Sequence, residues 1–193
     1  MVLLQLEIPL EVNRAVARWP GMRSSRNAQS APATDLDDEL LSLVTYLTPN
    51  EQEAAMETGL PLNMENGVIC PEDLARIAAA LRDKGVEHVI ITLGSNGSAV
   101  VEADGIRRIP CVKMSHVADP TAAGDSFVGA LSVGLTIGLS LENALAFASH
   151  TAAITVSRMG AMPSLPSLEE VEALLKERGF QGFALSALDV LRT

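Results

Sequence analysis

The residues best suited to chemistry lie in one short stretch, Ala118–Phe127, with the sequence ADPTAAGDSF. Its small residues Ala122, Ala123 and Gly124 let a ligand approach the backbone closely, and a helix is expected to begin there. The first N–H groups of a helix lack intrahelical partners and lie at the positive end of its dipole, which suits a phosphoryl group. Asp125 follows at once. It is either the N-terminal cap of the helix or a base that takes a proton from a hydroxyl attacking a bound phosphate.

A second candidate is a glycine turn that directly follows an apolar run at His88–Leu93. The run predicts a buried strand, and ligands of open α/β sheets bind at the carboxyl ends of such strands. The alternative is an ordinary hairpin with glycines at its turn. We call residues 92–97 the glycine loop; its members are Thr92, Leu93, Gly94, Ser95, Asn96 and Gly97.

A third candidate is the segment TPNEQE at residues 48–53. Asn50 and Glu53 are three residues apart, so they share one face at the start of a helix. They either meet a phosphate and a divalent cation together, or form a capping box in which Asn50 caps the helix and Glu53 completes it.

Other catalytic motifs are missing from the sequence, which contains no P-loop, GxGxxG, HExxH or GxSxG pattern. This argues against a dinucleotide enzyme, a zinc protease and a serine hydrolase of the α/β type. His88, His116 and His150 have no Cys or His at metal-ligand spacing, which argues against zinc.

The composition is that of a folded, acidic protein of 193 residues, with 48% apolar residues, 20% charged residues and a net charge of −10. An acidic surface repels a phosphate backbone, so no nucleic-acid partner is expected. Cys70 and Cys111 form no CxxC pair, and the apolar start lacks a basic leader, so we expect reduced thiols in a cytoplasmic protein. No apolar run reaches the length of a membrane span.

The hydrophobic pattern alternates between strands and helices, which predicts an α/β layered sheet. The stretch between Trp19 and Ser30 is polar and lacks periodicity, so no strand is expected there. Expected strands are 2–6, 44–47, 88–93, 98–102 and 107–112; expected helices are 10–18, 51–58, 71–84, 124–138, 141–156 and 167–178.

The order of the motifs TPNExE, TLGSxG, DPTAAGDSFxGAL and RxGAxPS resembles the ribokinase (pfkB-type) family of carbohydrate kinases, and so does the opening LLQLEIP. The resemblance implies a Rossmann-like three-layer α/β/α sandwich, incomplete at the N-terminus. It gives one nucleotide-binding domain at residues 1–178 and a tail at 179–193. The family's first strands, β lid, Gly-Gly hinge and sugar-gripping aspartate have no counterpart in this sequence.

The resemblance also assigns roles to residues. Asp125 matches the base that takes the proton from the sugar's 5-hydroxyl, and Ala122, Ala123 and Gly124 match the anion hole for the γ-phosphoryl group. Glu7 matches a sugar-hydroxyl contact.

On the nucleotide side, the glycine loop and Asn50 match ATP contacts, and Glu53 matches the acidic residue that organises Mg²⁺ and phosphate. Ser149, next to His150, takes the purine-side position. The positions that match the site of an activating potassium ion, mainly through main-chain carbonyls, are Asp119, Thr121, Thr155, Arg158, Gly160 and Ser164.

The implied function is ATP-dependent phosphorylation of a sugar hydroxyl, above all D-ribose to ribose 5-phosphate, with ATP, Mg²⁺ and K⁺ as cofactors. One alternative is a truncated, catalytically impaired ATP-binding fragment, and another is a related fructokinase or nucleoside kinase. Full-length relatives often dimerise through the lid, so a homodimer is implied for those relatives.

Overall fold

The computed structural model describes residues 1–19, 26–29, 36–65, 68–102 and 105–192. The chain divides into two compact units, Met1–Pro110 (the first unit) and Cys111–Thr193 (the second unit). The boundary expected at residue 178 falls inside the second unit, and a single domain over residues 1–178 stays a prediction.

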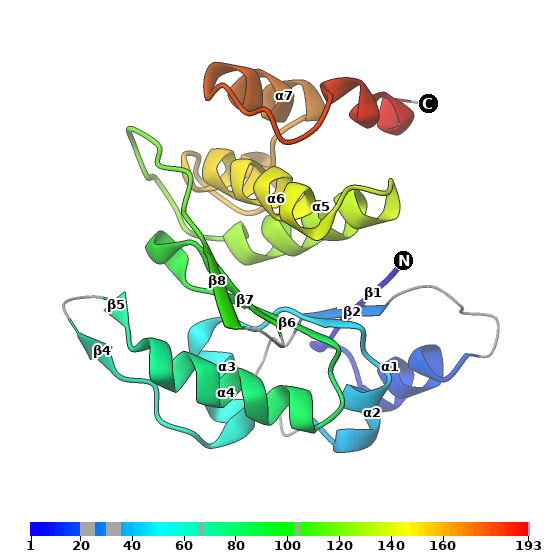
Figure 1. The fold of residues 1–193 in the computed structure, drawn as a ribbon. Helices are drawn as coiled ribbons and strands as arrows, with labels where there is room; N and C mark the ends of the chain where they lie inside the picture. The colour runs from blue at the N-terminus through cyan, green and yellow to red at the C-terminus, as the bar shows by residue number, and fades with distance from the viewer. Residues whose placement is uncertain (20–25, 30–35, 66–67, 103–104, 193) are drawn as a thin grey trace. The chain divides into compact units, whose positions relative to one another are not determined.

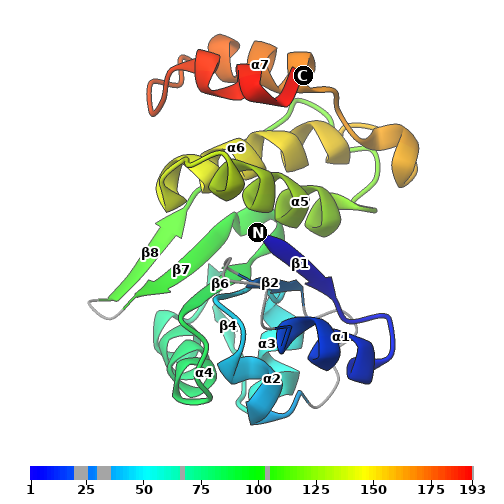
Figure 2. The same cartoon turned by 90° about the vertical axis from the view of Figure 1, so that its right-hand side faces the viewer.

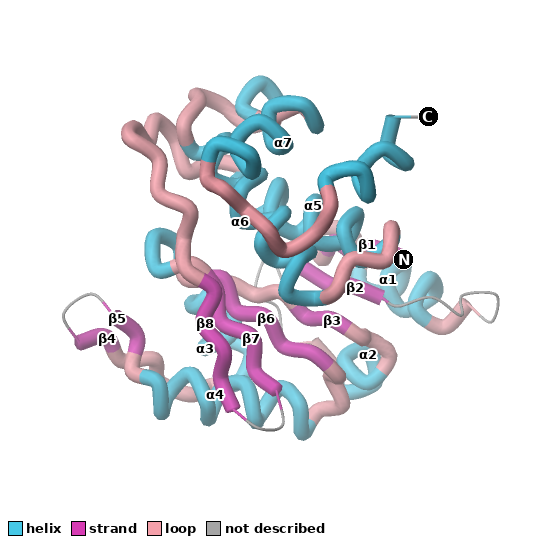
Figure 3. Tube along the Cα trace, turned by 45° about the horizontal axis from the view of Figure 1, so that its top comes forward, coloured by secondary structure: helices cyan, strands magenta, loops and turns pink. Residues whose placement is uncertain are grey.

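A six-stranded sheet forms the centre of the first unit, as the alternating pattern predicted (Figure 3). The order is β1-β2-β3-β6-β7-β8; the first four strands are parallel, and β7 and β8 each run antiparallel to the preceding neighbour. The strands are β1 (Val2–Gln5), β2 (Arg26–Gln29), β3 (Tyr46–Leu47), β6 (His88–Thr92), β7 (Ser98–Glu102) and β8 (Gly105–Ile109).

Four helices of the first unit lie on one face of this sheet (Figures 1 and 2). They are α1 (Leu10–Ala17), α2 (Asp38–Ser42), α3 (Glu51–Thr58) and α4 (Pro71–Asp83). Leu74, Ile77 and Leu81 recur at helical spacing on α4 and are fully buried in the same core as Val89 and Ile91 of β6. This burial explains why α4 and β6 were predictable, since apolar periodicity marks the face of an element that packs on a core. A small antiparallel hairpin of β4 (Met64–Glu65) and β5 (Val68–Ile69) was not predicted.

The structure corrects the sequence analysis between Trp19 and Ser30, because β2 occupies Arg26–Gln29 where no strand was expected. It pairs in parallel with β1 on one side and β3 on the other. Hydrogen bonds to two neighbours fix such a strand through its backbone, so polar residues without alternation can form it. The rest of that stretch, residues 20–25 and 30, lies outside the described residues.

A second correction concerns the acidic segment at residues 36–43, which is not among the expected helices. It contains the short helix α2, whose N-cap Asp37 accepts a hydrogen bond from the Leu40 N–H at 2.8 Å. Asp is a preferred N-cap, so the acidic residues mark the start of a helix here.

The second unit consists of helices α5 (Ala123–Thr136), α6 (Leu141–Val156) and α7 (Leu168–Glu177), with 3₁₀ turns η2 (Met162–Ser164) and η3 (Leu185–Arg192). Ser140 and Ser167 cap α6 and α7, and Ser167 and Glu170 form a capping box, which the S-x-x-E pattern at residues 167–170 indicates. Much of the expected tail is ordered against this unit: Leu188 is fully buried, and Arg192 pairs with Glu172 at 2.6 Å.

Within the described residues, no helix combines the length and apolar character needed to cross a membrane.

Candidate active site

Asn50 and the glycine loop lie next to each other at the carboxyl edge of the parallel strands. Asn50 follows β3 and forms a parallel bridge with Thr92, and the Thr92 N–H donates to the Pro49 carbonyl at 2.9 Å. The capping-box interpretation of Asn50 and Glu53 is confirmed. The Asn50 Oδ1 accepts from the Glu53 N–H at 2.9 Å, and Glu53 Oε2 accepts from the Asn50 N–H at 2.8 Å. The box therefore fixes both side chains beside the loop.

The glycine loop contains a single 3₁₀ turn, η1 (Gly94–Asn96), that connects β6 to the antiparallel β7. The hairpin interpretation is thus confirmed, and the role in ligand binding stays a prediction. Gly94 and Gly97 have φ angles of 53° and 85°, which side chains rarely allow and which glycine adopts without steric cost. Gly94 and Ser95 are exposed, so a ligand can reach their backbone.

Glu7 is exposed just beyond the end of β1, where its N–H donates to Gln5 Oε1 at 2.8 Å. Because β1, β3 and β6 are parallel, Glu7, Asn50 and the glycine loop all follow strands at the same edge of the sheet. That edge is where open α/β sheets bind ligands.

Asp125 lies exposed in the first turn of α5. The helix cap is Ala122, so the interpretation of Asp125 as N-cap is wrong: Asp125 is the third helical residue, and no side chain caps this helix end. The Ser126 N–H is the first to bond four residues back, to the Ala122 carbonyl at 2.9 Å. The N–H groups of Gly124 and Asp125 precede that bond at the positive end of the helix dipole, where an anion site is expected. The Ala123 N–H, also expected in the anion hole, instead donates to the Pro120 carbonyl at 3.2 Å.

Ala122 has φ 60° and ψ 9° and is the non-glycine residue with positive φ among those that the structure describes. An alanine in the left-handed region is strained, and such strain persists where surrounding contacts over-determine it.

Asp119 connects the loop before α5 to the loop after α6. Its Oδ1 accepts from the Thr121 N–H and its Oδ2 accepts from the Gly160 N–H, each at 2.9 Å. The Thr121 hydroxyl, and after it the N–H groups of Gly160 and Thr121, hold the pKa of Asp119 below its usual value. Asp119, Thr121 and Gly160, three of the residues predicted for the potassium site, are therefore close together.

The other predicted potassium residues place their side chains elsewhere. The buried Thr155 hydroxyl donates to the Thr151 carbonyl at 3.1 Å, and the buried Ser164 hydroxyl donates to the Ala161 carbonyl at 2.6 Å. Arg158 pairs with Glu170, with 3.2 Å between Arg158 Nη1 and Glu170 Oε2. Arg158 therefore has only its main-chain oxygen left as a cation ligand, and the role of these residues in a potassium site stays a prediction.

The donor chemistry fits both expected cations. No group of three His, Cys, Asp or Glu side chains suited to a metal ion occurs in the part of the chain that the structure describes. Carbonyl oxygens at the negative end of α6 and in the loop after it, together with the Asp119 carboxylate, are ligands that K⁺ takes. Glu53 offers a carboxylate beside the glycine loop, and Mg²⁺ needs only one or two carboxylates when phosphates supply other ligands.

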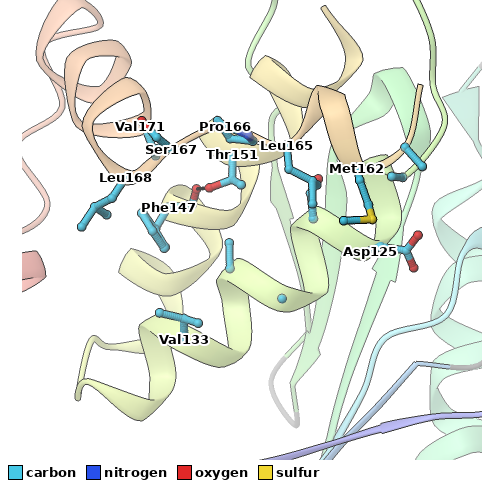
Figure 4. Close-up of a pocket in the computed structure, with 15 residues that line it drawn as sticks. Asp125, Val133, Phe147, Thr151, Met162, Leu165, Pro166, Ser167, Leu168 and Val171 are labelled. Atoms are coloured by element: carbon cyan, nitrogen blue, oxygen red, sulfur yellow. Dashed lines mark hydrogen bonds between the residues drawn. The ribbon is translucent and has the colours of Figure 1, made fainter. Parts of the chain in front are cut away.

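An apolar groove of about 490 Å³ runs along α5 in the second unit. Figure 4 shows Asp125 beside Met162 at one end of α5 and Val133 near the other. Met162 is 82% exposed. Sequence analysis missed this groove, although its lining on α5 recurs every three or four residues; these residues are Ala122, Asp125, Ser126, Gly129, Ala130 and Val133.

Comparisons with known proteins agree with this geometry. The model of the pfkB family carbohydrate kinases matches residues 12–168. A ribokinase of Schizosaccharomyces pombe is 39% identical over 176 residues, which are 89% of this chain and 54% of that protein. The structure of an Arabidopsis thaliana ribokinase complexed with ribose and ATP has a TM-score of 0.83 at 33% identity, covering 91% of this chain and 55% of that one.

A Thermotoga maritima ribokinase structure gives a TM-score of 0.78 at 36% identity, over 90% of this chain and 56% of that chain. The chain thus spans about half the length of the relatives that it matches.

Proposed function

Because the chain belongs to the pfkB family of carbohydrate kinases, we propose that it transfers the γ-phosphoryl group of ATP to the 5-hydroxyl of D-ribose. The observation that carries this proposal is the exposed carboxylate of Asp125 in the first turn of a helix that no side chain caps. A carboxylate in the first turn of a helix, at the positive end of its dipole, suits a site where a proton is removed and phosphoryl charge is stabilised at once.

In the proposed reaction, the sugar oxygen forms a bond to the γ-phosphorus as the bond between that phosphorus and the β-γ bridging oxygen breaks. The hydroxyl proton passes to Asp125, and ADP leaves. The Gly124 N–H and the positive end of α5 would stabilise the charge on the transferring group. Ala122 and Ala123 would form the small-residue turn that lets the phosphoryl group approach, and the Ala123 N–H donates to the Pro120 carbonyl at 3.2 Å. Glu7 would hold another sugar hydroxyl.

Asn50 and the glycine loop would hold ATP, with Ser149 on the purine side. Glu53 would bind Mg²⁺ through its carboxylate, one oxygen of which already accepts the Asn50 N–H. The metal ion neutralises phosphate charge when bound. K⁺ would be held by Asp119 and by main-chain carbonyls of the loops beside it.

Two alternatives rest on particular observations. The chain spans about half of its relatives, which supports an impaired fragment that binds ATP without transferring phosphate. The second alternative is a different acceptor, fructose or a nucleoside, because the exposed Glu7 is the one sugar-hydroxyl contact besides Asp125 that the resemblance assigns in this chain. Both cysteines are free thiols, which supports the proposal that the protein acts in the reducing cytoplasm.

The test is ADP formation by the purified chain with MgATP, K⁺ and each of ribose, fructose and a nucleoside, with a reaction lacking the acceptor as control. The proposal expects ribose to give the highest kcat/KM. Calorimetric binding of MgATP without acceptor-dependent ADP would instead establish the fragment. A preference for fructose or the nucleoside would replace ribose as the substrate.

A further inference from the structure

The turn that begins α5 is strained at Ala122, and that strain needs a source of restraint. Ala122 has a left-handed conformation at φ 60°, which the residue would leave if its neighbours allowed it. Part of that restraint lies in the turn itself, because the Ala123 N–H donates to the Pro120 carbonyl at 3.2 Å and closes the turn across Ala122. The rest acts on the loop of residues 118–121, from which the turn starts.

Two sets of hydrogen bonds hold that loop. The N–H groups of Ala118 and Asp119 both donate to the Val156 carbonyl, at 2.8 and 3.2 Å, which ties the backbone to the end of α6. The Asp119 side chain then places one oxygen on the Thr121 N–H and the other on the Gly160 N–H. The bond to Thr121 fixes the residue before Ala122, inside the turn that the Ala123 N–H and the Pro120 carbonyl close.

We infer that Asp119 is a positioning residue, whose carboxylate holds Ala122 in the left-handed region and so fixes the direction of the first N–H groups of α5 and of Asp125. The catalytic meaning of this inference rests on the proposed function. Charged acceptors make strong hydrogen bonds to backbone N–H groups, and a carboxylate can accept from two loops at once. Asparagine keeps only one of the two acceptor atoms, because its Nδ2 is a donor, so it cannot reproduce both bonds in this geometry.

The test uses Asp119→Asn, the double variant Asp119→Asn/Ala122→Gly, and Asp83→Asn as a matched control. Asp83 is an exposed aspartate on α4 in the first unit. Amide ¹H–¹⁵N spectra and hydrogen exchange are recorded in buffer without potassium, so that loss of an ion ligand contributes nothing to the result.

In Asp119→Asn, amide exchange at Gly160 or Thr121 should rise by about tenfold or more, and the amide resonances of Ala123, Gly124 and Asp125 should shift. Adding Ala122→Gly should return those three resonances toward wild type, because glycine adopts the left-handed region without strain. In the double variant, the amide exchange at Gly160 or Thr121 should stay as fast as in Asp119→Asn. Asp83→Asn should change neither these exchange rates nor the three resonances. Unchanged resonances in Asp119→Asn, or no recovery in the double variant, would overturn the inference.

A kinetic arm links the turn to catalysis. Asp119→Asn should lower kcat for ribose by about tenfold or more at saturating K⁺, with the KM for ATP within about twofold, because a displaced base slows the reaction without weakening nucleotide contacts. Ala122→Gly should recover part of that loss. An equal loss in the double variant contradicts the inference, whereas a wild-type chain without turnover counts against the proposed function and leaves the amide measurements to decide the inference.

Discussion

Two glycines of α5 should respond in opposite ways to the same substitution. Both lie inside a helix, where replacing glycine by alanine normally stabilises by about 1 kcal/mol through backbone entropy. A methyl group built at Gly129 would meet no atom within 4 Å. A methyl group built at Gly134 would lie 3.0 Å from Cβ and 3.2 Å from Cα of Ala144 on α6.

These distances set the expected difference between the variants. Gly129→Ala should gain the full propensity term, about 1 kcal/mol. Gly134→Ala gains the same stabilisation from helix propensity. Its new methyl group, however, forces α5 away from Ala144 of α6, which costs about 1–3 kcal/mol. Gly129→Ala should therefore be more stable than Gly134→Ala by about 1–3 kcal/mol, and Gly134→Ala should be no more stable than wild type.

The assay is urea unfolding followed by circular dichroism. The free energies of unfolding of both variants and the wild type are compared with one common m value, the slope of that free energy against urea concentration. The close approach of α5 and α6 at Gly134 positions the helix that carries Asp125. If both substitutions stabilise the protein equally, that approach does not exist, and the reasoning about how α5 is held is wrong.

Two further predictions concern charged side chains outside the candidate site. Arg192→Gln should raise the rate of amide exchange over residues 185–192, because Arg192 pairs with Glu169 at 2.7 Å and with Glu172 at 2.6 Å. In the wild-type protein, the protection of these amides from exchange should weaken in 1 M salt, which screens the ion pairs. Unchanged exchange in the variant would contradict this role of Arg192. The Leu40 N–H, and then the Arg14 side chain, hold the pKa of Asp37 below its usual value. Since a lowered folded-state pKa adds stability above the unfolded pKa and loses it as the pH falls through the folded value, Asp37→Asn should be less stable than wild type at pH 7. The difference should disappear in urea unfolding well below about pH 4, and a constant difference would refute the assignment.

The sequence predicted those helices and strands whose conformation is determined by residues close together in the chain. The apolar spacing of α4 and the capping boxes at Asn50 and Ser167 are signals carried within a few residues, and the structure has each of them. Strand β2 was missed because its polar residues carry no alternation, and pairing on both sides places it.

The candidate site was found by the same local signals, since one stretch carries Asp125 and the small residues before it. Its restraints were not predictable in this way. The hydrogen bond from Gly160 to Asp119 joins residues 41 positions apart, and nothing in the local sequence indicates that partner. The left-handed conformation of Ala122 was likewise not predictable, because alanine by itself favours the right-handed region.

The most direct test of the account compares Asp125→Asn with wild type in ribose-dependent ADP formation at saturating MgATP and K⁺. Asparagine keeps the shape of the side chain but cannot take the proton, so kcat should fall by about 10²–10⁴-fold while the dissociation constant for MgATP stays within about threefold. A variant that keeps more than about a tenth of wild-type kcat would show that Asp125 is not the base.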